Sequence, residues 1–532
     1  MSRIDRERGV DDRAGARPRG GGGSVTWWLL ALTVAAGLLR FYRIGSQSLW
    51  VDELWTLKAA AVGAELTAVG VFTNVQGPLH AVLVHLVSTL STSEAALRSI
   101  SAVFGTATVP LIYLLGSEVV DRRTGLIAAG LATVSPFLIW YSQELRNYAL
   151  LIFLSAAATV AVWRVVTRRT GPWISYGVTV ALAALSNLSA AFLAAAHWVF
   201  AVPRAREDRR FLARWMVTFL LVLICLSPWI WGVTRWVQMD RVAERVTTPG
   251  ADVKQERLRG DTTFTPMAIP YSLYAMVYGY SVGPSNAELH TLGPVAAFRS
   301  HGPAVVGAIA LMTAAGLVGI AMFWRDRLRL RLLVSTAVVP MLAVTLLASL
   351  NIKVFNARYV AVMAPLVIVV LASGIRRMPA AGAWVVGCGI VGMSLMGVVN
   401  YHTESGYWRE DVRSAARHLE AVEQRGDVVL VPVVTDVFDH YYGGALERHL
   451  LYPGQCGSDS EVAERVRAVT TGHARLWFVR SRLWHVDPDG RIARYLGTHH
   501  ELVQTASFPG VSVELYELHD SDATGVREPP GS

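Results

Sequence analysis

Eight long apolar runs constrain this chain more than any other feature of its sequence. Most approach the ~20 residues that cross a bilayer as a helix, because backbone N–H and C=O groups cannot stay unpaired in hydrocarbon. Only 17% of the 532 residues are charged and 53% are hydrophobic, too little charge to coat an ordinary globular surface. We therefore expect a mainly helical, polytopic membrane protein. The runs are residues 25–39, 99–115, 126–140, 149–162, 305–323, 332–350, 360–372 and 381–399.

The first apolar run follows an Arg- and Gly-rich head, residues 1–23. In charge this head is similar to the start of a signal peptide, but no small-residue cleavage site precedes the WWLL stretch, and the run continues to the length of a span. We expect a retained first helix, with residues 1–23 forming a disordered cytoplasmic tail.

Arginine clusters in short loops predict the topology, because such loops stay on the cytoplasmic side of a membrane. Threading the chain through these clusters requires about eleven spans, with the N-terminus cytoplasmic and the protein in the cell (plasma) membrane. The clusters lie in residues 1–23, 122–123, 164–169, 204–214, 325–331 and 376–377. The segments then predicted on the outer side are 44–76, 142–147, 186–189, 236–300, 351–358 and everything after Asn400.

Two segments do not fit a simple span. Residues 78–90 are apolar but about 13 long, which is more typical of a re-entrant or interfacial helix. Residues 173–202 form either one long helix or two short ones broken at Ser186-Asn187, and the loop charge on both sides favours two.

The composition changes after residue 400. Apolar runs become short and strand-like at 428–434, 476–479 and 511–516, with helix-like polar stretches at 409–424 and 460–470 between them. We expect residues 24–400 to form the membrane domain, with outer loops 44–76 and 236–300. Residues 401–532 should form an extracytoplasmic α/β domain large enough for its own core.

Three cysteines and 14 histidines offer no disulfide framework and no zinc spacing. His80 and His85 lie five residues apart, so they do not share a helix face as an i, i+4 metal pair would. No metal site and no divalent cation are implied. The net charge of +9 lies in the short loops, which is a topology signal and not a nucleic-acid footprint.

Adjacent acids stand just beyond the first span, in SLWVDELW. Asp52 and Glu53 beside Trp50 suit an acceptor hydroxyl that needs a base, while an aromatic face holds a sugar ring. The alternative is an N-terminal acid pair that favours the dipole of an interfacial helix running to about Val69. The residues alone leave the two interpretations evenly balanced.

A second cluster lies in the short outer turn of IWYSQELRNYALL, which holds Gln143, Glu144, Arg146 and Tyr148 between two hydrophobic helices. Ionisable groups at that depth are expensive and indicate function by default. The alternative is a Glu144–Arg146 pair solvated among the lipid headgroups.

A third cluster lies at the outer mouth of a span, in NIKVFNARYVAVMAPL, with Lys353, Arg358 and Tyr359. A guanidinium here can bind a phosphate through a forked pair of hydrogen bonds. The alternative for Lys353 and Arg358 is simple snorkelling to the interface.

These elements, together with QGPLH, ALRSISAVFGTATVPLIYLLG and WREDVRSAARHL, occur in an order that resembles bacterial integral-membrane glycosyltransferases. Over residues 25–442 the chain is similar to the GT-C superfamily, specifically to bacterial relatives of protein O-mannosyltransferases and of lipid A aminoarabinose transferases. The resemblance implies an outer-face active site and inverting transfer from a polyprenyl-phosphate sugar.

In such enzymes the acid of the first loop is the general base, which implies this role for Asp52, with Glu53 as its neighbour in the catalytic pair. The resemblance also implies that Arg358 and Tyr359 contact the carrier phosphate. The full set of substrate-binding residues implied is Trp50, His80, Tyr141, Gln143, Glu144, Arg146, Tyr148, Lys353, Arg358 and Tyr359.

The expected partners are the lipid-linked sugar donor, an envelope glycan, lipid or protein acceptor, and membrane lipids. The sugar is mannose or another hexose or pentose. Two other classes remain open: a lipid or glycan transporter or flippase, and a non-catalytic envelope assembly protein. Transporters commonly show repeats and polar sites at the midplane, whereas here no repeat is found and the polar groups gather at helix ends. Convergence of Asp52, Glu144 and Arg358 on one outward cavity would distinguish an enzyme from both alternatives, and scattered positions would favour the assembly protein.

Overall fold

The computed structural model describes residues 22–62, 77–168, 171–247, 265–350, 355–432, 434–451, 458–483, 487 and 489–519. The predicted tail up to residue 21 lies outside these ranges, as do Lys353 and the middle of the long 236–300 loop.

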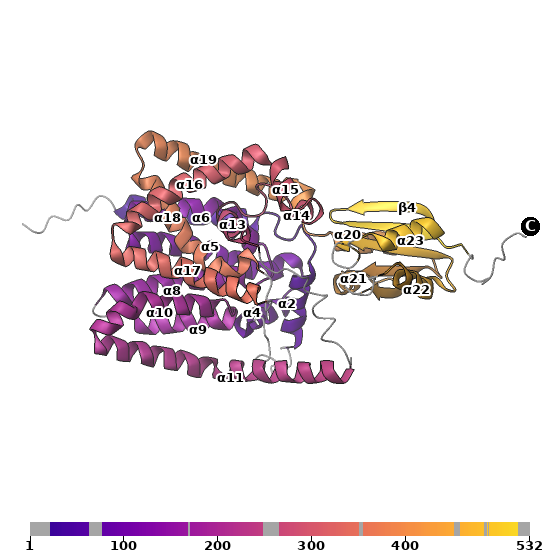
Figure 1. Ribbon diagram of the computed structural model, residues 1–532, viewed down its shortest axis with the longest axis horizontal. Helices are drawn as coiled ribbons and strands as arrows, with labels where there is room; N and C mark the ends of the chain where they lie inside the picture. The colour runs from indigo at the N-terminus through magenta and orange to yellow at the C-terminus, as the bar shows by residue number, and fades with distance from the viewer. Residues whose placement is uncertain are drawn as a thin grey trace, which may run out of the picture.

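A bundle of helices forms about the first three quarters of the chain, and a small sheet domain stands at one end of it (Figure 1). The mainly helical class is therefore confirmed. The first part of the bundle contains α1 (Gly22–Phe41), α2 (Val51–Val62), α4 (Pro78–Ser88), α5 (Glu94–Val119), α6 (Arg122–Val134), α7 (Pro136–Ser142), α8 (Tyr148–Thr167), α9 (Trp173–Ser186), α10 (Ala190–Glu207) and α11 (Arg209–Thr247). The second part contains α13 (Ala268–Tyr278), α14 (Asn286–Thr291), α15 (Pro294–Ser300), α16 (Gly302–Trp324), α17 (Arg327–Ser349), η2 (Ala357–Met363), α18 (Ala364–Arg377) and α19 (Ala380–Thr403).

Eight helices within the described residues are long and apolar enough to cross a membrane. The count reaches nine if α6 and α7, which meet at a 57° bend, form one broken span. The expected number of eleven is thus not confirmed. Residues 173–202 do form two helices, α9 and α10, and α4 has only 11 residues, shorter than a span.

Several loops that the sequence predicts on the same side of the membrane lie together in the structure. Segments predicted on the outer side meet at one end of the bundle, where Arg358 pairs with Asp52 and the Asn147 amide donates to the carbonyl of Ser186. Two of the arginine clusters meet at the other end, where Arg164 and Arg168 pair with Glu118, and Arg168 lines a cavity together with Arg204 and Arg210. The two ends are joined by α8, which begins beside Asn147 and ends at Thr167.

The C-terminal domain is a five-stranded mixed sheet with strand order β2-β1-β3-β5-β4. The strands predicted at 428–434, 476–479 and 511–516 are confirmed as β1, β3 and β5, while two more polar strands, β2 and β4, were not predicted. The strands are β1 (Val428–Pro432), β2 (Glu447–Leu451), β3 (Arg475–Ser481), β4 (Glu501–Phe508) and β5 (Val511–Glu517). Its helices are η3 (Ser405–Tyr407), α20 (Val412–Val422), α21 (Thr435–Tyr441), α22 (Asp459–Thr470) and α23 (Arg491–His499).

The sheet domain is docked on the loop that carries the Asp-Glu pair. Leu54 of α2 is 2% exposed and belongs to the same apolar cluster as α20, α21 and one face of the sheet. Polar contacts extend this interface: the Tyr441 hydroxyl accepts from the Leu49 N–H at 2.8 Å, and the Ser48 hydroxyl donates to the carbonyl of Glu410 at 2.7 Å. The position of α2 therefore depends on the C-terminal domain.

Gly77 permits the close approach of α4 to α9. Its φ is +113°, a region that side chains disfavour, and a Cβ there would collide with the carbonyl oxygen of Ser186. We expect Gly77→Ala to destabilise the protein by about 1–3 kcal/mol, measured as a lower unfolding temperature in detergent. Gly307→Ala is the control, because Gly307 lies inside α16 with open space around its Cα. Equal stability of the two variants would contradict this assignment.

Candidate active site

The first turn of α2 places two acids in opposite environments. Glu53 has no exposed surface, and Arg98 of α5 holds its carboxylate through two hydrogen bonds of 2.8 and 2.7 Å. The Leu145 N–H donates to the same carboxylate at 2.6 Å. Arg98 also donates to the carbonyls of Ile44 and Gln47, so it fastens the loop before α2 to the bundle.

Burial alone would raise the pKa of Glu53, but Arg98 and Arg409 lower it to below its ordinary value. Glu53 is therefore an ionised, buried anchor for the loop. Its side chain faces the protein interior, while its neighbour Asp52 faces outward.

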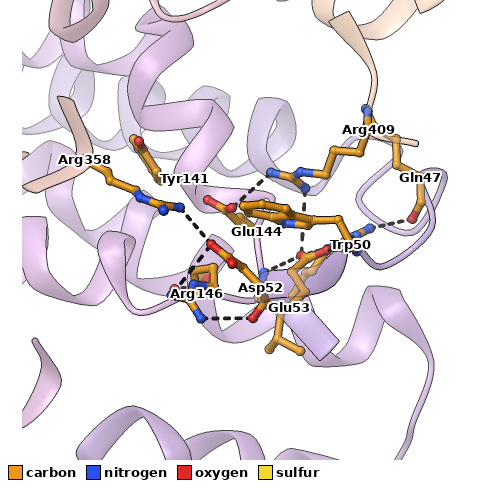
Figure 2. A network of polar contacts seen from close by, with 12 residues as sticks. Gln47, Trp50, Asp52, Glu53, Tyr141, Glu144, Arg146, Arg358 and Arg409 are labelled. Atoms are coloured by element: carbon orange, nitrogen blue, oxygen red, sulfur yellow. Dashed lines mark hydrogen bonds and ion pairs between the residues drawn. The ribbon is translucent and has the colours of Figure 1, made fainter. Parts of the chain in front are cut away.

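Asp52 keeps 30% of its side chain exposed and lies between two arginines (Figure 2). Its Oδ2 accepts a hydrogen bond of 2.8 Å from Arg358 and lies 3.9 Å from a terminal nitrogen of Arg146. Arg146 also donates to the Asp52 carbonyl at 2.9 Å and to the Thr56 hydroxyl at 2.8 Å, which fixes the first turn of α2. Three segments far apart in sequence thus meet at one carboxylate.

Arg358 is held in place and does not snorkel freely. Its guanidinium lies over the rings of Tyr148 and Tyr359, at 5.8 and 5.4 Å from their centroids. The Asn356 side chain accepts from the Arg358 N–H at 3.1 Å and caps η2. The Arg358 side chain is 23% exposed, so an anion can still reach its guanidinium.

The short turn between α7 and α8 contributes both structure and charge. Gln143 donates to the carbonyls of Arg40 and Tyr42 at 3.0 and 2.8 Å, which caps the end of α1. Asn147 bonds to Ser186 and Asn187 at the α9–α10 break. Glu144 is 2% exposed, so it is not simply solvated at headgroup level.

Arg409 enters this cluster from the C-terminal domain, just before α20 (Figure 2). Its guanidinium lies over the rings of Trp50 and Trp140, at 5.5 and 5.1 Å. It stands 3.4 Å from Glu144 and 3.8 Å from Glu53. Burial raises the pKa of Glu144 above its ordinary value, and Arg409 partly offsets this rise.

Several polar atoms in this cluster lack a hydrogen-bond partner among the described residues. They include both terminal nitrogens of Arg409, Oε2 of Glu144 and the indole N–H of Trp50. Buried polar groups are normally satisfied, and each exception calls for an explanation. A polar substrate would supply the missing partners.

The remaining predicted residues lie around this centre. His80 on α4 is 3% exposed, and its Nε2 has no hydrogen-bond partner among the described residues. Tyr141 is buried, and its hydroxyl lies 2.8 Å from that of Tyr280. Arg146 lies over the Tyr148 ring at 5.9 Å. Lys353 lies outside the described residues.

Asp52, Glu144 and Arg358 therefore belong to one cluster of charged side chains at this end of the bundle. Within the described ranges, no group of three or more His, Cys, Asp or Glu side chains is placed to hold a metal ion. The sequence did not assign Arg98 to the site, and it left open whether Trp408 and Arg409 bind an acceptor glycan or only dock the C-terminal domain on the membrane part. Arg98 lies directly before the apolar run 99–115, so a charge at the end of a predicted span was an available signal.

The comparisons with known proteins bear on fold and family. Residues 75–231, less than a third of the chain, match the family model for dolichyl-phosphate-mannose-protein mannosyltransferase. No curated protein sequence matches the chain.

Solved structures match over nearly the whole length. ArnT from Cupriavidus metallidurans in the apo state is 12% identical with a TM-score of 0.56, covering 92% of this chain and 98% of that one. The same protein bound to undecaprenyl phosphate gives 12% and 0.53, covering 94% and 100%. The oligosaccharyltransferase AglB from Archaeoglobus fulgidus, in complex with an inhibitory peptide and a dolichol-phosphate, gives 13% and 0.50, covering 93% and 75%. At these identities the likeness establishes the fold.

Proposed function

We propose that this chain, which has the GT-C fold of integral-membrane glycosyltransferases, is an inverting transferase that takes a sugar from a polyprenyl-phosphate carrier. The acceptor is an envelope glycan, lipid or protein, and the sugar is mannose or another hexose or pentose. The single observation that carries the proposal is the 2.8 Å pair between Asp52 and Arg358, an accessible acid beside an accessible cation. The presence of polyprenyl and dolichyl phosphates in the two similar structures supports the choice of donor.

Asp52 is the general base in this proposal. Its carboxylate takes the proton of the acceptor hydroxyl while that oxygen attacks the anomeric carbon from the face opposite the phosphate. The bond between the anomeric carbon and the phosphate oxygen breaks, and the electron pair leaves with the phosphate. An anionic leaving group needs no protonation, so one base and cationic phosphate ligands suffice.

Arg358 is the phosphate ligand, and its pairing with Asp52 suggests how donor binding prepares the base. Oδ2 of Asp52 is the atom that accepts from Arg358 in the structure. A donor phosphate that recruits the guanidinium, with Tyr359 beside it, releases this oxygen to accept a proton. Binding of the donor then precedes activation of the acceptor.

The buried residues keep the reacting groups in position. Glu53 holds the α2 loop through Arg98, and Arg146 fixes the first turn of α2. The Arg409 guanidinium lies over the rings of Trp50 and Trp140, and its terminal N–H groups and the Trp50 indole N–H have no hydrogen-bond partner among the described residues. Aromatic faces and N–H donors of this kind suit a sugar ring and its hydroxyls. His80, Tyr141, Gln143, Glu144 and Tyr148 complete the wall of the site.

The arginine clusters at the end opposite the site favour a plasma-membrane protein with its active site and C-terminal domain on the outer face. The decisive experiment incubates purified protein with a panel of polyprenyl-phosphate sugars and candidate acceptors, with mass spectrometry of the products. Transfer from at least one donor is expected, and absence of any transfer together with donor-independent lipid translocation would favour a flippase.

Arg358→Gln should chiefly weaken use of the donor. The substitution removes the cation that faces the carrier phosphate, so we expect the KM for the donor to rise by about tenfold or more, with a smaller change in the KM for the acceptor. The measurement is initial rate against donor concentration.

The matched control is Arg448→Gln, because Arg448 is a half-exposed residue of the C-terminal domain that pairs with Asp439 at 3.4 Å. It should leave both KM values unchanged. An unaltered donor KM in the Arg358 variant would support simple anchoring of that side chain at the interface.

A further inference from the structure

A second polar site lies at the end of the bundle far from Asp52. The chain runs from the active site at Tyr148 along α8 to Thr167, 20 residues or about 30 Å of helix. There the end of α8 and the α10–α11 connection enclose a cavity of about 250 Å³. This volume far exceeds the ~10–15 Å³ that a single water needs.

The cavity is strongly cationic. It is lined by four arginines and one aspartate, which leaves an excess of three positive charges, together with Val165, Trp173 and Phe211. The charged lining residues are Arg168, Arg204, Asp208, Arg210 and Arg214.

Local acids only partly offset this charge. Arg168 is engaged by Glu118 at 2.8 Å, and Arg204 lies 3.8 Å from Asp208. Asp208 itself accepts from the backbone N–H groups of Arg210 and Phe211 at 2.9 and 3.1 Å, as the residue before α11. No acidic partner lies within ion-pair distance of the Arg210 or Arg214 side chains among the described residues.

Two lining residues also present buried N–H groups that lack an acceptor. The indole Nε1 of Trp173 and the Nε of Arg204 are inaccessible to solvent and have no hydrogen-bond partner in the described part of the chain. Such groups cost free energy unless an acceptor reaches them. Cations and unpaired donors around one cavity define a site for an oxyanion, and phosphate is the anion that arginine recognises best.

The surroundings identify the source of the phosphate. Apolar side chains flank the cavity on the helices that line it: Ile174 of α9 is 84% exposed, and Met216 of α11 is 51% exposed. In a membrane these faces meet acyl chains, whereas a free phosphate ion would use none of them. Basic pockets between membrane helices bind phospholipid headgroups in this way.

We propose that this cavity binds the headgroup of an anionic phospholipid from the leaflet opposite the active site. The phosphate accepts from Trp173 and Arg204, and Arg210 and Arg214 supply the remaining charge. The acyl chains lie along the exposed faces of α9 and α11. Predicted topology alone explains why arginines occur at this end, but it does not explain a cavity or its unpaired N–H groups.

The test uses the full-length protein in detergent, delipidated and titrated with phosphatidylglycerol or phosphatidylcholine, with bound lipid counted by native mass spectrometry. Wild type should retain phosphatidylglycerol in preference to phosphatidylcholine. The Arg210→Gln/Arg214→Gln double variant should lose affinity for phosphatidylglycerol at least about tenfold. Trp173→Phe keeps the ring but removes the N–H, and should weaken the same binding more modestly.

The control is Arg325→Gln/Arg327→Gln, an equal change of charge at two exposed residues between the end of α16 and the start of α17, neither of which lines the cavity. It should retain wild-type lipid binding. Equal loss in both double variants would overturn the proposal in favour of general surface attraction, and displacement of the lipid by millimolar inorganic phosphate would assign the cavity to a free ion. Because the readout is bound lipid, failure here is independent of the transferase proposal.

Discussion

Asp52→Asn should lower the rate of sugar transfer by about 10²–10⁴-fold, the range that general-base catalysis contributes. The amide keeps the shape of the side chain and can still contact Arg358, but it cannot take a proton from the acceptor hydroxyl. The loss should appear in kcat at saturating donor. The measurement is single-turnover transfer by purified protein.

Asp436→Asn is the matched control. Asp436 lies on α21 and pairs with Lys58, and Lys58 belongs to the same helix, α2, as Asp52. The Asp436 side chain is 45% exposed and lies outside the charged cluster. It should transfer at the wild-type rate. Both variants should insert into membranes and unfold at the wild-type temperature, and retained transfer by Asp52→Asn would remove this residue from the mechanism.

Arg98→Gln is expected to have the largest effect on stability, about 3–5 kcal/mol, because it leaves the fully buried Glu53 without its main partner. The variant also loses the bonds that hold the loop before α2, so transfer should fall as well. Unfolding in detergent followed by circular dichroism gives the stability.

The double variant Glu53→Gln/Arg98→Gln removes both charges of the buried ion pair, whereas Arg98→Gln leaves the Glu53 carboxylate buried without its main partner. Comparing the stabilities of the two variants shows how much of the loss comes from that unpaired charge. With no charge left buried, it should be more stable than Arg98→Gln alone. A double variant as unstable as the single would show that the loop contacts of Arg98, and not the ion pair, dominate.

The same pair predicts a dependence on pH. The folded-state pKa of Glu53 lies below its unfolded value of about 4.3, so its contribution to stability is present above that pH and is lost as the pH falls through the folded-state pKa. In Arg98→Gln, burial dominates and raises this pKa, so ionised Glu53 destabilises the fold near neutrality. The gap in unfolding temperature between wild type and variant should therefore narrow on acidification from pH 6 to about pH 4.

The features predicted best from the sequence are the apolar helices, because their length and composition follow from the thickness of the membrane. Apolar runs of span length predicted the helical class, and short strand-like runs predicted three of the five strands, whereas the topology predicted from the arginine clusters stays a prediction. Motif order predicted a GT-C superfamily protein, which the likeness to ArnT confirms in fold. Strands β2 and β4 were not predicted because they contain many polar residues. Strand β4 lies at the edge of the sheet and is mostly exposed.

The sequence predicted a group of polar residues, most of which lie together in the described part of the chain, but it did not predict their arrangement. Periodicity and spacing cannot show that Glu53 faces inward while Asp52 faces Arg358, because this depends on the register of α2 against α5. The sequence left the role of Arg409 open, because that role depends on the C-terminal domain docking on α2, a contact between segments more than 350 residues apart. The number of spans could not be predicted because helices such as α9 are apolar but short, and length and hydropathy are the only signals that the sequence gives for a span.

The entry of Arg409 between Trp50 and Trp140 has a consequence for biosynthesis. The cation that faces Glu144 and Glu53 is made only after every helix of the bundle has been synthesised. Until then, the nascent chain carries two buried acids that share an incomplete set of counter-ions. Completion of this charged cluster is therefore a late event in synthesis, because Arg409 follows α19 in the chain.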